Sequence, residues 1–131
     1  MWKIREDVSI AAKMCGKVIA YDLSFDVKEW TQLVAELRRT IKAEVMGYGH
    51  IGDGNIHINM IFKEGESAQH QKVFEEVVKK KGSISAEHGL GLHKAPYLSL
   101  QKPPLIINYY KQIKKLFDPN EIMNPYKYLP E

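Results

Sequence analysis

EVMGYGHIGDGNIHINMIF, residues 44–62, is the stretch of sequence that decides the fold. Gly52-Asp53-Gly54 separates two extended runs, and an Asp-Gly pair in that position is a strong signal for a β-hairpin with strands over 44–50 and 55–62. Side chains alternate between the two faces of a strand. We therefore expect the second strand to have an apolar face (Ile56, Ile58, Met60) and a polar face (Asn55, His57, Asn59).

Hydrophobic periodicity and capping residues predict the elements on either side of this hairpin. They are, in chain order, a helix over 2–16, a strand over 18–23, a helix over 27–42, the hairpin, a helix capped by Ser67, a short strand over 83–87 and a helix from Pro103-Pro104. Strands paired by hairpins, with helices packed on one face, make an α+β fold of ferredoxin-like type with an antiparallel sheet. Residues 1–131 are expected to form one domain that ends in an irregular tail.

Some side chains outside the hairpin also carry predictions. Cys15 falls on the apolar face of the first helix, so we expect a buried small side chain rather than a nucleophile. His70 falls on a polar helix face and is expected to be solvated. Lys79-Lys80-Lys81 is interpreted as a solvated helix end, with Gly82 as the C′ residue. The last helix should place Ile106, Tyr110, Ile113 and Phe117 on one face.

Composition limits the class of protein. The chain has 131 residues, of which 44% are apolar and 27% charged, and its formal net charge is +3. These values exclude disorder, collagen and a disulfide scaffold. A single cysteine excludes an internal disulfide, a CxxC redox pair and a cysteine-rich zinc site. The charge is too small to argue for nucleic acid binding, and no apolar run approaches the roughly 20 residues that span a bilayer.

The unusual chemistry lies on the polar face of the second hairpin strand. Burying two asparagines and a histidine is costly unless they bind something, although the same face could simply be exposed to solvent. The tight turn folds His50 back towards His57, so that two imidazoles can converge. Later in the chain, Ser85-Ala86-Glu87-His88-Gly89 adds a carboxylate beside another histidine.

A metal site is one interpretation of these residues. Two histidines and one glutamate are the ligand set of an open catalytic metal site, which leaves positions for water or substrate. In a regular strand Glu87 and His88 point to opposite faces, so only one of them should be a ligand. We assign Glu87 to the metal with His50 and His57, and His88 to acid–base work.

Other motifs in the same region have simpler interpretations. Asp53 is assigned to turn chemistry rather than to a metal. The glycines do not form a GxGxxG between a strand and a helix, so they give little support to a phosphate loop. The absence of HExxH leaves a zincin without support. His93 lies near the site in sequence and is left unassigned, with a surface position favoured over a site role.

Three motifs occur together and in order: GHIGDGNIH (49–57), SAEHG (85–89), and FDPN (117–120) with NPYK (124–127). In this combination, nearly the whole chain resembles the C-terminal part of the FAD-linked 2-hydroxyacid dehydrogenases. That family includes flavin-type D-lactate dehydrogenases, the glycolate oxidase flavoprotein subunit and D-2-hydroxyglutarate dehydrogenases. The NPYK motif and Tyr21-Asp22-Leu23-Ser24 make the resemblance closest to the D-2-hydroxyglutarate dehydrogenase group.

The resemblance implies a fold, cofactors and a mechanism. The fold is the family's α+β cap for substrate and metal, and the chain is a fragment whose N-terminal FAD-binding domain lies outside it. A divalent metal, expected to be zinc, is held by His50, His57 and Glu87. His88 takes the proton of the substrate hydroxyl while hydride passes to the flavin.

The resemblance also implies roles for residues away from the metal. Arg5 and Ser9, one helical turn apart, would grip the distal carboxylate of the substrate, since arginine suits bidentate recognition. Ser9 is equally an ordinary helix-face residue. Asn55 would hold the substrate or a site water, and Asn124 and Lys127 would approach the flavin.

Two positions depart from the family's pattern. Ala20 stands where the hydroxyglutarate group has a lysine, so one basic contact to a dicarboxylate is missing. This difference favours D-lactate or another short 2-hydroxy acid as the substrate. Glu121 replaces a glycine that is usual in the tail motif, which is expected to alter the turn there.

The expected function is that of a fragment of an FAD-dependent oxidoreductase, which oxidises a D-2-hydroxy acid (D-2-hydroxyglutarate or D-lactate) to the 2-oxo acid. The fragment alone should be inactive because it lacks the hydride acceptor. The resemblance implies an intracellular, mitochondrial protein, and the electron acceptor is left unassigned. Two alternatives stay open: a protein-interaction module, suggested only by an actin-interacting label in the family, and a stand-alone metal-assisted hydrolase.

Overall fold

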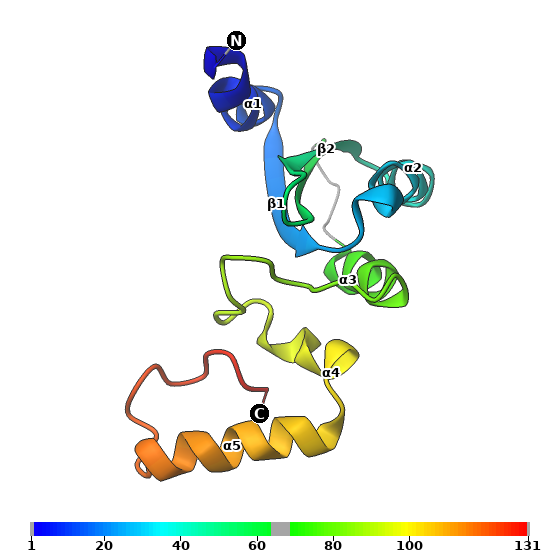
Figure 1. The fold of residues 1–131 in the computed structure, drawn as a ribbon. Helices are drawn as coiled ribbons and strands as arrows, with labels where there is room; N and C mark the ends of the chain where they lie inside the picture. Colours follow the sequence, from blue (N-terminus) through cyan, green and yellow to red (C-terminus); the bar gives the residue numbers. More distant parts are fainter. Residues whose placement is uncertain (1, 64–68, 131) are drawn as a thin grey trace. The chain divides into compact units, whose positions relative to one another are not determined.

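The computed structural model describes residues 2–63 and 69–130 of the chain. The chain divides into two compact units, residues 1–86 and residues 87–131. In Figure 1 the colours follow the sequence, from blue at the N-terminus to red at the C-terminus. Among the described residues, no helix combines the length and the apolar character that crossing a bilayer requires.

An antiparallel sheet forms the centre of the first unit. Its strands are β1 (Lys17–Ser24), β2 (Glu44–His50) and β3 (Asn55–Phe62), in the order β1-β3-β2. The hairpin register pairs Tyr48 with His57 and His50 with Asn55. In the turn, Oδ1 of Asp53 accepts the N–H of Asn55 at 3.1 Å, which confirms the turn role of Asp53. Both hairpin strands are confirmed at the predicted residues.

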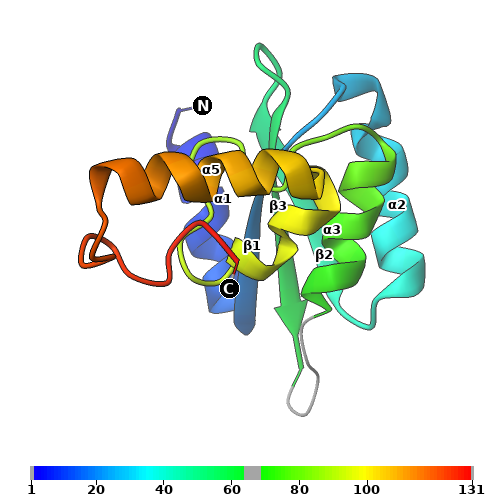
Figure 2. The same ribbon diagram turned by 90° about the horizontal axis from the view of Figure 1, so that it is seen from below.

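The apolar face of β3 is buried, as the alternation predicts. Ile56, Ile58 and Met60 are each at most 1% exposed. Helices α2 (Trp30–Thr40) and α3 (His70–Lys79) lie on the same side of the sheet in Figures 1 and 2. A Cβ at Gly47 would lie 2.8 Å from Cγ2 of Val34, so α2 packs tightly on this face.

The helix predicted over 27–42 has two parts. A 3-10 helix, η1 (Val27–Glu29), leads directly into α2. Oδ1 of Asp26 accepts the N–H of Lys28 at 3.0 Å, so Asp26 caps this 3-10 helix.

The end of α3 differs from the prediction. Lys81 takes the left-handed conformation, with φ 57°. The N–H groups of Lys81 and Gly82 donate to the carbonyls of Val78 and Val77, which is a Schellman ending with Lys81 at C′. The assignment of Gly82 to C′ is therefore wrong. Gly82 instead allows close approach, because a Cβ there would lie 2.7 Å from the Ser24 carbonyl oxygen. The predicted cap, Ser67, lies outside the described residues.

The strand predicted over 83–87 does not form. A single bridge pairs Ser24 with Ser83. The N–H of Ala86 then donates to the side-chain Oδ2 of Asp22 at 3.0 Å. This hydrogen bond takes the place of one to the backbone of a neighbouring strand. The first unit nevertheless keeps the βαββα order with an antiparallel sheet, and the α+β class is confirmed.

Helix α1 (Trp2–Met14) confirms the first predicted helix but not its buried face. Ala12 is its one buried residue among those described, and Ile4 is 74% exposed. Cys15 is also exposed, so the prediction that it is buried is wrong. The helix meets the sheet near Gly16, where a Cβ would lie 3.2 Å from Cγ2 of Ile61, whereas Ile4, Ala11 and Cys15 of its apolar stripe are exposed.

Two side chains expected to be solvated have partners in the first unit. Nδ1 of His70 lies 3.0 Å from the hydroxyl of Tyr21. The ammonium of Lys80 lies 2.8 Å from Glu29 and 3.7 Å from Glu36. The hydrogen bond to Glu29 is the main reason that the pKa of Lys80 is raised. The solvated positions predicted for His70 and Lys80 are wrong, because a helical pattern does not reveal partners from other elements. Lys79 and Lys81 are exposed, as the prediction of a solvated helix end requires.

The second unit contains η2 (Ala95–Tyr97), α4 (Leu98–Gln101) and α5 (Pro104–Phe117). Pro104 opens α5, as predicted. Ile107 is buried, but Ile113 and Phe117 of the predicted face are 55% and 77% exposed. The tail is irregular, as predicted, and the N–H of Tyr128 donates to the Gly91 carbonyl at 2.8 Å. His93 is exposed, as expected.

Candidate metal and catalytic site

The polar face of the sheet brings two imidazoles together. His50 and His57 have ring centroids 5.5 Å apart in an edge-on arrangement, and a nitrogen of each lies within 4.8 Å of the other. The pairing places Tyr48 opposite His57, and His50 is two residues further along the same face. The side chain of His57 is 16% exposed and His50 is exposed. The convergence expected from the turn is therefore present, and it is open to a ligand.

Asp22 on β1 completes this face. The register places it directly opposite His57, and its Oδ1 lies 3.8 Å from Nδ1 of His57. A carboxylate beside one ring nitrogen of a histidine favours the proton on that nitrogen and leaves the other for a ligand. Asp22 was not predicted from the sequence as a site residue. The sequence feature that could have identified Asp22 is its position as a charged residue between Tyr21 and Leu23, two apolar residues of a buried strand.

Two asparagines add buried acceptors to the same face. Asn55 and Asn59 are 4% and 2% exposed. Nδ2 of Asn59 donates to the hydroxyl of Tyr48 at 3.1 Å. The Oδ1 atoms of both asparagines are buried, with no hydrogen-bond partner among the described residues. Such atoms cost free energy unless a ligand or water donates to them. Asn59 was not assigned a role from the sequence, although the alternation places it beside His57.

Glu87 and His88 open the second unit. Nε2 of His88 lies 3.4 Å from Oε1 of Glu87, and both side chains are more than half exposed, at 65% and 54%. Because residues 84–88 are not a strand, strand alternation does not separate the directions of these two side chains. That argument for choosing Glu87 over His88 fails, and the roles of both residues stay predictions.

Arg5 and Ser9 lie one turn apart on α1, whereas the histidines lie on β2 and β3. The guanidinium of Arg5 sits 5.4 Å from the centroid of the Trp2 ring and is exposed. Ser9 is half-buried. Their role towards a substrate carboxylate stays a prediction.

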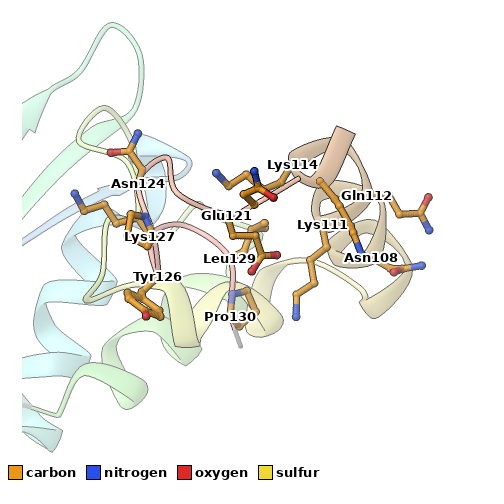
Figure 3. Close-up of a pocket in the computed structure, with 13 residues that line it drawn as sticks. Asn108, Lys111, Gln112, Lys114, Glu121, Asn124, Tyr126, Lys127, Leu129 and Pro130 are labelled. Atoms are coloured by element: carbon orange, nitrogen blue, oxygen red, sulfur yellow. The ribbon is translucent and has the colours of Figure 1, made fainter. Parts of the chain in front are cut away.

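Asn124 and Lys127 lie in the second unit, where they line a cavity of about 710 Å³. Figure 3 shows Lys111 and Lys114 on its α5 side and the tail residues on the other side. Lysines outnumber acidic residues in the lining, and this balance favours an anionic group.

Asp118 holds the start of the tail. Its carboxylate pairs with the ammonium of Lys114 and accepts the N–H groups of Ile122 at 3.1 Å and Met123 at 2.9 Å. The Lys114 hydrogen bond is the main reason that the pKa of Asp118 is lowered. The contribution of Asp118 to stability is therefore present at neutral pH and lost as the pH falls through the lowered pKa.

The donors of the first unit fit a divalent metal. Imidazole nitrogens suit zinc and other late first-row metals, and His50 and His57 present two of them side by side. The carboxylate of Asp22 behind His57 is the outer support that metal-bound histidines commonly have. Two histidines leave room for a carboxylate and for a water or substrate oxygen.

The comparisons identify relatives for nearly the whole chain. Residues 1–128 match the family model of the FAD linked oxidases, C-terminal domain. A probable mitochondrial D-2-hydroxyglutarate dehydrogenase of Oryza sativa is 44% identical, over 99% of this chain and 24% of the relative. The mitochondrial D-2-hydroxyglutarate dehydrogenase of Rattus norvegicus is 39% identical, over 99% and 26%. The D-2-hydroxyglutarate–pyruvate transhydrogenase of Saccharomyces cerevisiae is 37% identical, over 98% and 29%.

The chain thus spans about a quarter of the length of the curated relatives it matches. The family match reaches from the first helix to the tail, so it includes every predicted site residue. The resemblance drawn from the three motifs is confirmed, and the chain belongs to the FAD linked oxidases, C-terminal domain family.

Proposed function

We propose that this chain is the substrate- and metal-binding part of an FAD-dependent dehydrogenase that oxidises a D-2-hydroxy acid to the 2-oxo acid. The observation that carries the proposal is the His50–His57 pair. It stands on a sheet face beside two buried amide oxygens for which the described part of the chain offers no hydrogen-bond donor. The family match supports a flavin enzyme, and the names of the rice and rat relatives support the substrate class.

We assign His50, His57 and Glu87 as the ligands of a divalent metal, which we take to be zinc because two imidazoles and a carboxylate suit it. When bound, the metal would act as a Lewis acid that stabilises the ionised hydroxyl of the substrate. Glu87 is included because the chain just before it is fixed: the N–H of Ala86 is hydrogen-bonded to Asp22.

His88 is the proposed base. Its imidazole accepts the proton of the 2-hydroxyl, and the C–H electron pair leaves the same carbon as hydride, so the 2-oxo acid forms with the loss of one proton and one hydride. FAD, held mainly by a domain outside this chain, would supply the hydride acceptor. The side chain of His88 is 65% exposed, which makes it accessible to a substrate.

The remaining residues position the substrate and the flavin. Asn55 offers a buried acceptor to a substrate hydroxyl or a site water. Arg5, with Ser9, is proposed to bind a distal carboxylate, and the exposed guanidinium is free to reorient from Trp2. Asn124 and Lys127 are proposed to face the flavin, from a cavity whose lysines suit its phosphates.

Two further observations support a proposal for which acid is the substrate and for where in the cell the intact protein lies. Ala20 is exposed on β1 and brings no cation, which favours D-lactate or another short acid over a dicarboxylate. The rice and rat relatives are named mitochondrial, and we extend that location to the intact protein that carries this chain.

Flavin reduction tests the activity. The intact protein is mixed with D-lactate, D-2-hydroxyglutarate and their L enantiomers, and the loss of oxidised-flavin absorbance is followed. We expect bleaching with a D acid and not with its L enantiomer. Absence of bleaching with every D-2-hydroxy acid would contradict the proposed activity.

Elemental analysis tests the metal. We expect about one zinc ion per chain in the intact protein and its loss in His57→Ala, because one of the few ligands is gone. His93→Ala is the matched control, since it removes an exposed histidine that has no assigned role. Stoichiometric zinc retained in His57→Ala would refute the ligand assignment.

A further inference from the structure

Asp22 is a buried carboxylate without a role in the proposed mechanism, and its two oxygens face two different parts of the candidate site. We propose that Asp22 is the positioning residue of this site: Oδ1 orients the imidazole of His57, and Oδ2 anchors the chain one residue before Glu87. This inference rests on the proposed metal site and adds a residue that neither the motifs nor the comparisons assign.

Oδ1 of Asp22 faces the imidazole of His57 across the sheet. Its Nδ1 faces Oδ1 of Asp22 at 3.8 Å, across adjacent strands whose register places the two residues opposite each other. The carboxylate can only accept, so it favours the imidazole tautomer that carries its proton on Nδ1. Nε2 then keeps its lone pair, and this is the state that a metal ligand needs.

Oδ2 of Asp22 holds the main chain just before Glu87. Oδ2 of Asp22 accepts the N–H of Ala86 at 3.0 Å, and Ser83 bridges to Ser24 just before it. A carboxylate that accepts an amide N–H makes a charge-assisted hydrogen bond, which is stronger than a neutral one. The main chain entering Glu87 is therefore attached to the same side chain that faces His57.

The burial of Asp22 argues against a merely space-filling role. The residue is 4% exposed, and its strand neighbours Tyr21 and Leu23 are 2% and 0% exposed. A carboxylate in such a place is costly unless hydrogen bonds and opposite charge compensate it. The N–H of Ala86 supplies one such hydrogen bond to Oδ2, and the imidazole of His57 is the polar group that faces Oδ1.

Asp22→Asn separates orientation from packing, because asparagine has nearly the same shape. Its amide oxygen can still accept the N–H of Ala86, but its NH₂ group then faces Nδ1 of His57. That donor favours the tautomer with the proton on Nε2, which removes the ligand lone pair. In the intact protein we expect Zn²⁺ affinity, measured by competition with a chromophoric chelator, to fall about 10- to 100-fold.

Further measurements and two more variants keep the test decisive. The absorption spectrum of Co²⁺ in the site should change in Asp22→Asn, while far-ultraviolet circular dichroism and the thermal midpoint stay near those of the unsubstituted protein. Asp22→Glu, which restores a carboxylate, should recover part of the lost affinity. Asp26→Asn is the control, because asparagine caps a helix as well as aspartate does.

The outcomes distinguish this inference from the proposed function. If the unsubstituted protein holds neither Zn²⁺ nor Co²⁺, the metal site itself fails. If it holds both ions and Asp22→Asn holds them equally tightly with the same Co²⁺ spectrum, the metal site stands and the role of Asp22 is refuted. If Asp22→Glu is as weak as Asp22→Asn, orientation by a carboxylate is also refuted.

Discussion

The two units of the chain fix their polar residues by different means. In the first unit, strand pairing sets the direction of each side chain, and His57 faces Asp22 because the two residues are paired across β1 and β3. In the second unit, no strand lies among the described residues, and one carboxylate organises the backbone. Asp118 accepts the N–H groups of Ile122 and Met123.

The two units also differ in how they bury apolar residues. Leu33 and Leu37 of α2 are 0% exposed, whereas Leu116 and Phe117 of α5 are each 77% exposed. The lesson is that the candidate histidines stand on a sheet with its own core, so their arrangement depends on packing. The tail residues depend on local hydrogen bonds and backbone conformation, and the two kinds of support should fail under different substitutions.

The largest contrast is expected from matched leucine truncations. Leu37→Ala removes a fully buried side chain, and we expect the first unit to lose about 2–5 kcal/mol of opening free energy, through lost burial and a cavity. Leu116→Ala should change the second unit by less than about 0.5 kcal/mol, because that side chain is mostly in solvent. Hydrogen exchange of β3 and α5 amides in the intact protein measures both. Equal effects would break the comparison.

Close backbone approach in the hairpin predicts the next effect. A Cβ at Gly49 would lie 2.1 Å from the Asn55 carbonyl oxygen and 2.8 Å from Cα of Ile56, and backbone atoms cannot give way as a side chain can. We expect Gly49→Ala to cost about 1–3 kcal/mol and to disturb His50, measured by β3 amide exchange and zinc content. Gly52→Ala is the matched control, since a Cβ there meets nothing within 4 Å. If Gly49→Ala changed neither β3 amide exchange nor zinc content, the hairpin backbone would have to move to make room for the methyl group at no measurable cost.

Local sequence signals predicted the hairpin and its two faces because those features depend on residues close in sequence. The Asp-Gly turn fixes the register, and the register fixes which side chains share a face. The strand over 83–87 was wrong for the converse reason. Its fate depends on Asp22, more than 60 residues earlier, whose side chain takes the N–H of Ala86 in place of a backbone partner.

The same distinction applies to the site. His50 and His57 could be placed together from the turn and the alternation alone. Asp22 could not, because its place beside His57 requires the pairing of β1 with β3, which no short pattern states. Cys15, Ile4 and Phe117 show a second limit: periodicity identifies an apolar stripe, but it does not say whether another element covers that stripe.

The smallest effect is expected in the tail, whose structure depends on backbone conformation rather than on a buried apolar core. Glu121 takes φ 54°, a left-handed conformation that costs a non-glycine residue roughly 1–2 kcal/mol. We expect Glu121→Gly to stabilise the turn by about 1 kcal/mol after the entropy cost of glycine. The N–H groups of Ile122 and Met123, held by Asp118, should then exchange about five-fold more slowly.

Glu121→Ala is the control, because it removes the same side chain without easing a left-handed φ, and it should give no protection. Equal protection in both variants would assign the effect to the glutamate side chain rather than to the backbone. The tail would then resemble the first unit, where side-chain contacts hold the chain in place.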